Sequence, residues 1–262
     1  MAWLTSPEPP SVALPVPTVD DILTRPGLAE AQSPVEFLMQ QMAIDPASSC
    51  QVEEMTRGQA DNPLWSVYRR GRLTASNFGP VVRCLNSNRK PSQSLLHTLL
   101  GTKDLSKMRA VQWGKNNEST ARDLYSELQE VEVQQRGLFL HTSGILAASP
   151  DGLVSDSKVI EIKCPFSLRD KSITSAVGDG FYVKTVGAGE YELNLSDTSG
   201  FNYYHQIQGV MHMTNTTECD FIVWSPVDFL IFTVDRDSLW SENVPKLISF
   251  YKEHVAPKLI ST

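Results

Sequence analysis

The segment from Ser149 to Lys163 reads SPDGLVSDSKVIEIK and carries two patterns typical of a β-hairpin. Apolar and polar residues alternate in its second half, with the period of a half-buried strand. Residues 155–157 (SDS) in the middle have the composition of a tight turn. The turn therefore predicts an antiparallel hairpin that joins the strand expected over 158–164 to the strand before it, expected over 144–148.

The charged residues of this hairpin form a candidate catalytic group. Glu161 and Lys163 project from one face of the strand, Ile162 points the other way, and Asp151 lies on the partner strand. Two carboxylates on adjacent strands can share Mg²⁺, and a lysine beside them can orient or deprotonate a water molecule or neutralise charge on a phosphate. The alternative is an ion pair on the solvent face of an antiparallel sheet, which is common. The Pro-Asp-Gly string and the apolar neighbours favour the catalytic interpretation.

The hydrophobic period changes near the middle of the chain. Helical spacing dominates the first half. We expect five helices there: one that begins at residue 33, one that ends at residue 70, one over 74–84, one that begins at residue 92 and one over 107–130. Strand patterns dominate the second half, over 131–135, 144–148, 158–164, 181–186, 191–195 and 221–234, with helices over 201–213 and up to 254. The order predicts an α/β fold with a central mixed β-sheet flanked by helices.

The N-terminal end differs in composition from the rest of the chain. Residues 1–33 are rich in Pro, Ser and acidic residues, which predicts a disordered leader, followed by one domain over 34–262. The first 24 residues contain no basic residue, unlike a signal peptide, and no segment reaches the roughly 20 apolar residues of a membrane span. Four widely separated cysteines suit a reducing compartment. We therefore expect an intracellular protein, in the nucleus or the cytoplasm.

The charge is distributed unevenly. The chain has a net charge of −7, yet residues 69–122 contain eleven basic and only two acidic residues. A segment this basic can supply a phosphate-binding face while its flanks stay acidic, because local potential captures a polyanion. The alternative is a set of solvated helix faces.

Five short strings, in order between residues 65 and 208, resemble one known family, and the likeness extends over about residues 65–234. They are Trp65 with RLTAS at 72–76, WGKNNE at 113–118, SPDGL at 149–153, EIKCPF at 161–166 and YYHQIQ at 203–208. The chain resembles the YqaJ viral recombinase and lambda-type alkaline exonuclease family of the PD-(D/E)xK nuclease superfamily. The resemblance implies a restriction-endonuclease-like core.

The resemblance also implies roles for the acidic residues. Asp151, Glu161 and the main-chain carbonyl of Ile162 correspond to metal ligands, and Lys163 to the catalytic lysine. Glu118 would complete the acidic set. On the residues alone, Glu118 could equally be a surface residue paired with an arginine four positions later.

A glutamine and a phosphate pocket are implied in the same way. Gln206 matches a glutamine that the family directs at the active site. Gln208 lies about 200° further round the same helix, so one of the two is expected on the surface. A pocket for the 5′-phosphate of a duplex end corresponds to Arg69, Ser76, Ser149 and Arg169, because guanidinium and hydroxyl groups suit phosphate oxygens. The alternatives are that Ser76 only caps its helix and that Arg69 lies on a solvated face.

The implied activity is Mg²⁺-dependent hydrolysis of DNA, with Mn²⁺ able to substitute, as an exonuclease on 5′-phosphorylated duplex ends in recombination or repair. Implied partners are DNA, further copies of the chain and a single-strand-annealing protein. An endonuclease on the same core and a non-catalytic DNA-binding module remain alternatives. The connection from Glu161 to Gln206 is longer than in compact phage members, and its additional residues, 178–200, could reshape the DNA channel or the subunit contacts.

Overall fold

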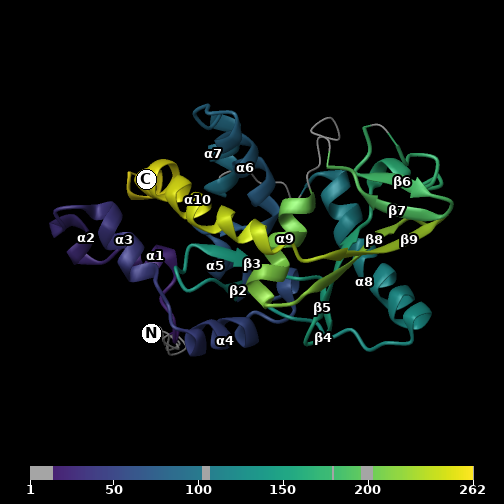
Figure 1. The fold of residues 1–262 in the computed structure, drawn as a ribbon. Helices are drawn as coiled ribbons and strands as arrows, with labels where there is room; N and C mark the ends of the chain where they lie inside the picture. The colour runs from purple at the N-terminus through teal and green to yellow at the C-terminus, as the bar shows by residue number, and fades with distance from the viewer. Residues whose placement is uncertain (1–13, 102–106, 179, 196–202, 262) are drawn as a thin grey trace, which may run out of the picture.

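The computed structural model describes residues 14–101, 107–178, 180–195 and 203–261. Helices and strands are mixed along the chain, as the sequence predicted (Figure 1). The helices are α1 (Val19–Leu23), α2 (Pro26–Glu30), α3 (Pro34–Met42), α4 (Pro46–Met55), α5 (Pro63–Arg69), α6 (Phe78–Asn86), α7 (Gln93–Leu99), α8 (Arg109–Gln129), α9 (Tyr203–Thr214), α10 (Asn243–Phe250) and α11 (Ala256–Ile260). No helix within the described ranges is both long and apolar enough to cross a membrane.

The strands form two sheets and a separate hairpin. They are β1 (Leu73–Thr74), β2 (Phe139–Leu140), β3 (Leu146–Ala148), β4 (Gly152–Ser155), β5 (Lys158–Lys163), β6 (Val183–Gly187), β7 (Glu190–Leu193), β8 (Glu218–Trp224) and β9 (Phe229–Asp235). The larger sheet has the order β4-β5-β8-β9, the smaller sheet has the order β1-β3-β2, and β6 pairs with β7. Both sheets combine parallel and antiparallel pairs, so the predicted mixed sheet is confirmed.

The predicted turn at residues 155–157 is confirmed, but the strand that it joins to β5 is β4; the strand expected over 144–148 instead forms β3 of the smaller sheet. Gly152 pairs with Ile160 in antiparallel register, and the turn falls between Ser155 and Lys158. On its other side β5 runs parallel to β8, with Glu161 opposite Phe221. Both edges of β5 are paired, and both of its faces are covered, since Val159 belongs to the largest hydrophobic cluster and Ile160 and Ile162 belong to another.

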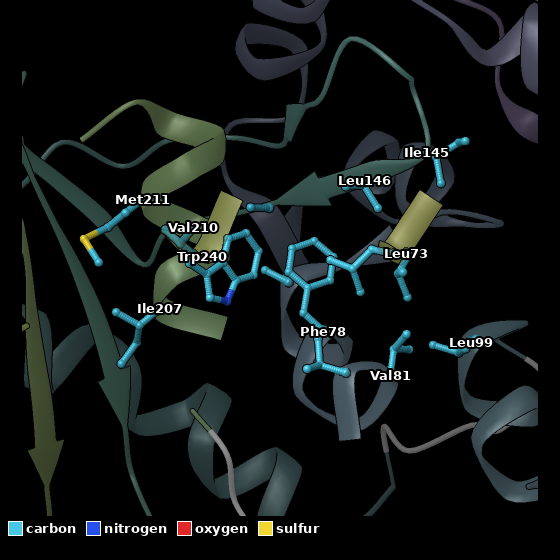
Figure 2. Packing of buried hydrophobic residues seen from close by; sticks show 14 of the residues in the cluster. Leu73, Phe78, Val81, Leu99, Ile145, Leu146, Ile207, Val210, Met211 and Trp240 are labelled. Atoms are coloured by element: carbon cyan, nitrogen blue, oxygen red, sulfur yellow. The ribbon is translucent and has the colours of Figure 1, made fainter. Parts of the chain in front are cut away.

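The largest hydrophobic cluster lies between α6, α9 and the smaller sheet. Figure 2 shows Phe78 and Trp240 beside α9, and their ring centroids are 5.9 Å apart. Gly209 of α9 permits this contact, because a Cβ atom there would lie 2.4 Å from the Phe78 ring. The close packing sets the position of α9, the helix that carries Gln206.

The prediction of a disordered leader is wrong for residues 14–33; residues 1–13 lie outside the described part. Two short helices form here, and Val19 and Ile22 of α1 are buried in the largest cluster. A Thr18–Asp21 capping box closes the first turn of α1, and the hydroxyl of Tyr68 donates to the carbonyl of Val16. The Pro-, Ser- and acid-rich composition of this segment therefore predicted disorder, although a few apolar residues such as Val19 and Ile22 pack into the core.

One other element differs from the predictions, and the strands expected within residues 178–200 are confirmed. Residues 131–135 form only a single bridge, between Gln134 and Leu153, and not a strand. Within residues 178–200, of which 179 and 196–200 lie outside the described part, β6 and β7 form the expected strand pair. This hairpin lies on the right in Figure 1, at the far end of the molecule from α2 and α3.

Candidate active site

The strand β5 holds Glu161 and Lys163 side by side. Ile160 and Ile162 pack on the opposite face, beneath α8, which confirms the predicted alternation. Glu161 is only 1% exposed, so the alternative of an ion pair on a solvent face does not apply. A carboxylate this deep needs compensating partners or a functional reason.

Asp151 reaches the same place from the start of the hairpin. Its main-chain N–H donates to the carbonyl of Ile160 at 3.2 Å, and its Oδ2 accepts from the N–H of Ile162 at 2.7 Å. The next residue, Gly152, leaves room for a close neighbour, since a Cβ atom there would lie 2.2 Å from Val133 Cγ1. The Pro-Asp-Gly string therefore places a carboxylate directly beside the strand that carries Glu161.

The two oxygens of Glu161 have different surroundings. Oε1 accepts hydrogen bonds from Lys163 Nζ and from Gln206 Nε2 of α9. Oε2 is buried and has no hydrogen-bond partner among the described residues. An unpartnered buried carboxylate oxygen is costly, and it is a natural acceptor for a cation.

Glu118 joins this group from the middle of α8. Arg122, which is 13% exposed, donates to Glu118 Oε1 at 2.6 Å and to the main-chain carbonyl of Asp151 at 3.1 Å. The helical ion pair therefore exists, and the Glu118 side chain, which is 35% exposed, lies at the mouth of the site and not on an open helix face. Arg122 ties Glu118 to the residue that carries the second carboxylate.

Crowding of these acids changes their protonation. Burial, followed by the charge of Asp151, raises the pKa of Glu161 to about 8 and that of Glu118 to about 7. Burial also raises the pKa of Asp151. The pKa of Lys163 is raised despite its burial, because the Glu161 carboxylate favours the charged ammonium. The site therefore favours added positive charge.

The donor set fits a hard divalent cation. As they stand, no three His, Cys, Asp or Glu side chains in the described part of the chain are grouped as a ready metal site. The free Oε2 of Glu161 and the nearby carboxylate of Asp151 nevertheless supply the oxygen ligands that Mg²⁺ takes, with water completing its shell. The roles of Asp151, Glu161, Glu118 and the Ile162 carbonyl as metal ligands stay predictions.

Three of the four predicted phosphate-binding residues lie together next to this group. Arg69, Ser76 and Ser149 line one cavity of about 190 Å³ with Asp151, Glu161, Lys163 and Gln206. The Trp65 indole forms part of the wall: its Nε1 donates to Ser149 Oγ at 2.8 Å, and the Arg69 guanidinium lies 3.9 Å from its ring centroid. Arg69 does not lie on a solvated face, because it is half-buried and stacked on Trp65. Ser76 does not cap α6, because Asn77 is the residue that precedes this helix.

Arg69 is suited to an anion. Burial lowers its pKa to about 10, which still leaves it protonated at neutral pH. No carboxylate lies within ion-pair distance of its guanidinium among the described residues. A half-buried cation without an acidic partner is a ready phosphate ligand.

Arg169, the fourth residue, is not brought to this cavity. The 3₁₀ turn η3 (Phe166–Leu168) redirects the chain after β5, and the Arg169 guanidinium lies 4.4 Å from the centroid of the Phe166 ring. It also contacts Asp170 at 3.2 Å and is 41% exposed. Its assignment to the phosphate pocket stays a prediction that this arrangement does not favour.

The expectation of one surface glutamine on α9 is wrong. Gln206 faces Glu161 as predicted, but Gln208 is also buried. Its side chain donates to the Asp235 carbonyl and accepts from the Asp237 N–H, which joins α9 to the end of β9. The angle of about 200° between Gln206 and Gln208 correctly predicted that the two side chains face different ways. The sequence could not show that the end of β9 covers the side of α9 that carries Gln208.

Three site residues had no assigned role in the sequence analysis. Arg122 was considered only as a surface partner, and Trp65 only as part of a motif. Tyr203 lies under the ammonium of Lys163, with Nζ 4.7 Å from its ring centroid. The signals were present, since Trp65 and Tyr203 belong to the matching strings and Arg122 lies one helical turn after Glu118.

Comparison with known proteins supports this picture. The alkaline nuclease of Autographa californica nuclear polyhedrosis virus is 26% identical over 216 residues, which cover 76% of this chain and 49% of the viral protein. The alkaline exonuclease LHK-Exo from Laribacter hongkongensis has a solved structure that matches with a TM-score of 0.53 and 25% identity, over 75% of this chain and 93% of that one. The chain spans about half the length of the curated relatives it matches.

A more distant structure shares the fold alone. The Shutoff and Exonuclease Protein of Kaposi's sarcoma-associated herpesvirus matches with a TM-score of 0.50 and 11% identity, over 93% of this chain and 80% of that one. The decisive match is to a family model described as the YqaJ-like viral recombinase domain, which covers residues 64–217. Because that match spans more than half of the sequence, the chain belongs to the YqaJ-like viral recombinase family, as its motifs predicted.

Proposed function

We propose that this chain is a divalent-metal-dependent deoxyribonuclease that acts as an exonuclease on 5′-phosphorylated ends of duplex DNA. The observation that carries the proposal is the buried Glu161 beside Asp151 and Lys163, in a cavity shared with Arg69 and two serines. The names of the relatives, an alkaline nuclease and an alkaline exonuclease, support the same reaction class.

Asp151 and Glu161 would hold the cation, with Glu118 and the carbonyl of Ile162 as further ligands. We propose Mg²⁺ as the ion, with Mn²⁺ able to substitute, because every proposed donor is an oxygen atom. A bound Mg²⁺ supplies Lewis acidity, which polarises the scissile phosphate.

The protonation states suggest separate tasks for the other residues. Lys163 keeps its proton, so its ammonium is suited to stabilise charge developing on the phosphate, and not to accept a proton. Glu118 would act as a further ligand or, if it does not bind the ion, as the group that orients the attacking water. Gln206 holds Glu161 through Oε1 and leaves Oε2 available.

The test uses end-labelled linear duplex and closed circular duplex, each incubated with Mg²⁺ or with EDTA. Cleavage of the linear DNA only, dependent on Mg²⁺ and lost in Glu161→Gln, is the expected result. Nicking of circles would favour an endonuclease on the same core. Retained binding without cleavage in Mg²⁺ would favour a non-catalytic DNA-binding module and refute the proposal.

End recognition is tested separately with a matched pair of arginines. Initial rates on 5′-phosphate and 5′-hydroxyl ends are compared for the parent, Arg69→Ala and Arg169→Ala, and read as coupling energies. We expect Arg69→Ala to lose about 1.5–3 kcal/mol on phosphorylated ends only, roughly ten- to a hundredfold. Arg169 also stacks on an aromatic ring but lies outside the cavity, so the effect of Arg169→Ala should depend little on whether the end carries a phosphate. Zero coupling for Arg69 would contradict the 5′-phosphate pocket.

A further inference from the structure

A second, larger cavity lies on the other side of Lys163. It has a volume of about 620 Å³, within the range typical of small-molecule sites, and Glu118, Ile162 and Lys163 form one of its walls. Ile162 and Lys163 also line the smaller cavity that contains Arg69. The two cavities therefore meet at the end of β5, where hydrolysis is proposed.

The far walls of this larger cavity are aromatic. They are formed by Phe166 from the turn after β5, Phe181 and Tyr182 from the residues before β6, and Tyr203 from α9. Tyr182 packs between its neighbours, with ring centroids 4.0 Å from Phe181 and 4.9 Å from Tyr203. The rings therefore support one another, and the cavity wall is preorganised.

The two cavities differ in chemistry. Arginine and hydroxyl groups line the smaller one, which suits a phosphate. Aromatic rings line the larger one, and among the described residues of its lining Glu118 and Lys163 carry the only charges, both on the wall shared with the carboxylate group. Such a surface suits a flat, uncharged π-system and not a phosphate, because an anion would lose its hydration without gaining donors.

We propose that the larger cavity binds an unpaired nucleobase, that of the nucleotide on the 3′ side of the scissile bond. This inference rests on the proposed function, which places the 5′-phosphate in the Arg69 cavity and the scissile phosphate at Lys163. A strand that continues past Lys163 brings its next base to the aromatic walls. Stacking on aromatic rings is tolerant of sequence, so the site selects an unpaired nucleotide and not a particular base.

The first test measures binding in EDTA, where no cleavage occurs. A 5′-phosphorylated single-stranded oligonucleotide carries the fluorescent base 2-aminopurine at its first or its second nucleotide. For an enzyme that removes mononucleotides, the second base lies on the 3′ side of the scissile bond. We expect the protein to change the emission at the second position, and an abasic residue there to weaken binding roughly five- to a hundredfold.

Matched variants assign the effect to the cavity. Phe181→Leu and Phe166→Leu keep apolar volume but remove a ring from the wall. The control, Tyr191→Leu, removes a partly buried ring from β7, outside the cavity. We expect the first two variants to lose the emission change and the discrimination against the abasic oligonucleotide, and Tyr191→Leu to keep both. If Phe181→Leu lowers the melting temperature, the proposal is still tested by Phe166→Leu and by the comparison of the abasic and intact oligonucleotides on the parent protein.

Binding indifferent to the abasic residue, or an emission change confined to the first nucleotide, would overturn the proposal. The proposal would also be overturned if Phe181→Leu, Phe166→Leu and Tyr191→Leu all kept the emission change or all lost it. Because these measurements need no hydrolysis, they are independent of the nuclease test. A protein that cleaves DNA but ignores the abasic residue refutes the base site alone, and one that never cleaves in Mg²⁺ refutes the nuclease.

Discussion

Lowering the pH should weaken binding of a divalent cation, because protons compete for the same oxygens. Burial and the charge of Asp151 raise the pKa of Glu161 to about 8 and that of Glu118 to about 7. Ligand carboxylates must be ionised to bind a metal, so each proton on these residues must leave when the ion enters.

The expected magnitude follows from these two values. Between pH 8 and 7 one proton is displaced, and the apparent affinity falls about tenfold per pH unit. Below pH 7, if Glu118 is also a ligand, a second proton is displaced and the fall approaches about a hundredfold per unit. Stability follows the same linkage. Because the folded protein holds the Glu161 proton more tightly than the unfolded chain, protonation of Glu161 stabilises the metal-free fold. This contribution is complete below pH about 4.5, decreases as the pH rises, and is lost above pH about 8.

Calorimetric titration with Mg²⁺ in two buffers of different ionisation enthalpy counts the protons released. We expect between about one and two protons per ion at pH 7, and about one fewer for Glu161→Gln. Melting temperatures provide a second measurement, since Mg²⁺ should stabilise the protein more at pH 8.5 than at pH 6. An affinity that changes less than about twofold between pH 8 and 6 would refute this reasoning. A constant tenfold slope would remove Glu118 from the ligand set.

Three substitutions test other parts of the structure. Lys163→Ala should lose most cleavage but keep Mg²⁺ affinity in calorimetry, because Lys163 contacts Glu161 and is not a proposed ligand; normal cleavage would contradict its role. Arg122→Ala should lower the free energy of unfolding by about 1–3 kcal/mol, because it leaves Glu118 and the Asp151 carbonyl without a donor; urea unfolding at pH 8 measures this. Ile22→Ala should cost about 2–5 kcal/mol in the same assay, whereas a disordered leader would give no change.

The core of the site was predictable because its signals are local. Strand alternation places Glu161 and Lys163 on one face, and the turn at residues 155–157 brings Asp151 opposite them, so neither required knowledge of distant packing. Family motifs added Gln206 and the cavity residues Arg69, Ser76 and Ser149.

The errors share a different physical cause. Residues 14–33 look disordered by composition, but a few apolar side chains such as Ile22 fill gaps that distant elements create. Gln208 is buried because the end of β9 covers the back of α9, a tertiary contact with no local pattern. Arg169 follows a turn, and six residues of motif spacing after Lys163 do not determine where a long side chain points after that turn.

The Trp65 indole has an optical consequence. Its Nε1 donates to Ser149 and its ring lies beneath Arg69, so a phosphate bound between these two residues would change both contacts of the fluorophore. The chain contains five tryptophans, and Trp224 and Trp240 are buried elsewhere, so a Trp65→Phe difference spectrum isolates the relevant emission. If the proposed pocket holds the 5′-phosphate, the indole of unlabelled protein would report docking of a DNA end, which could be followed in a stopped-flow instrument before any bond is cleaved.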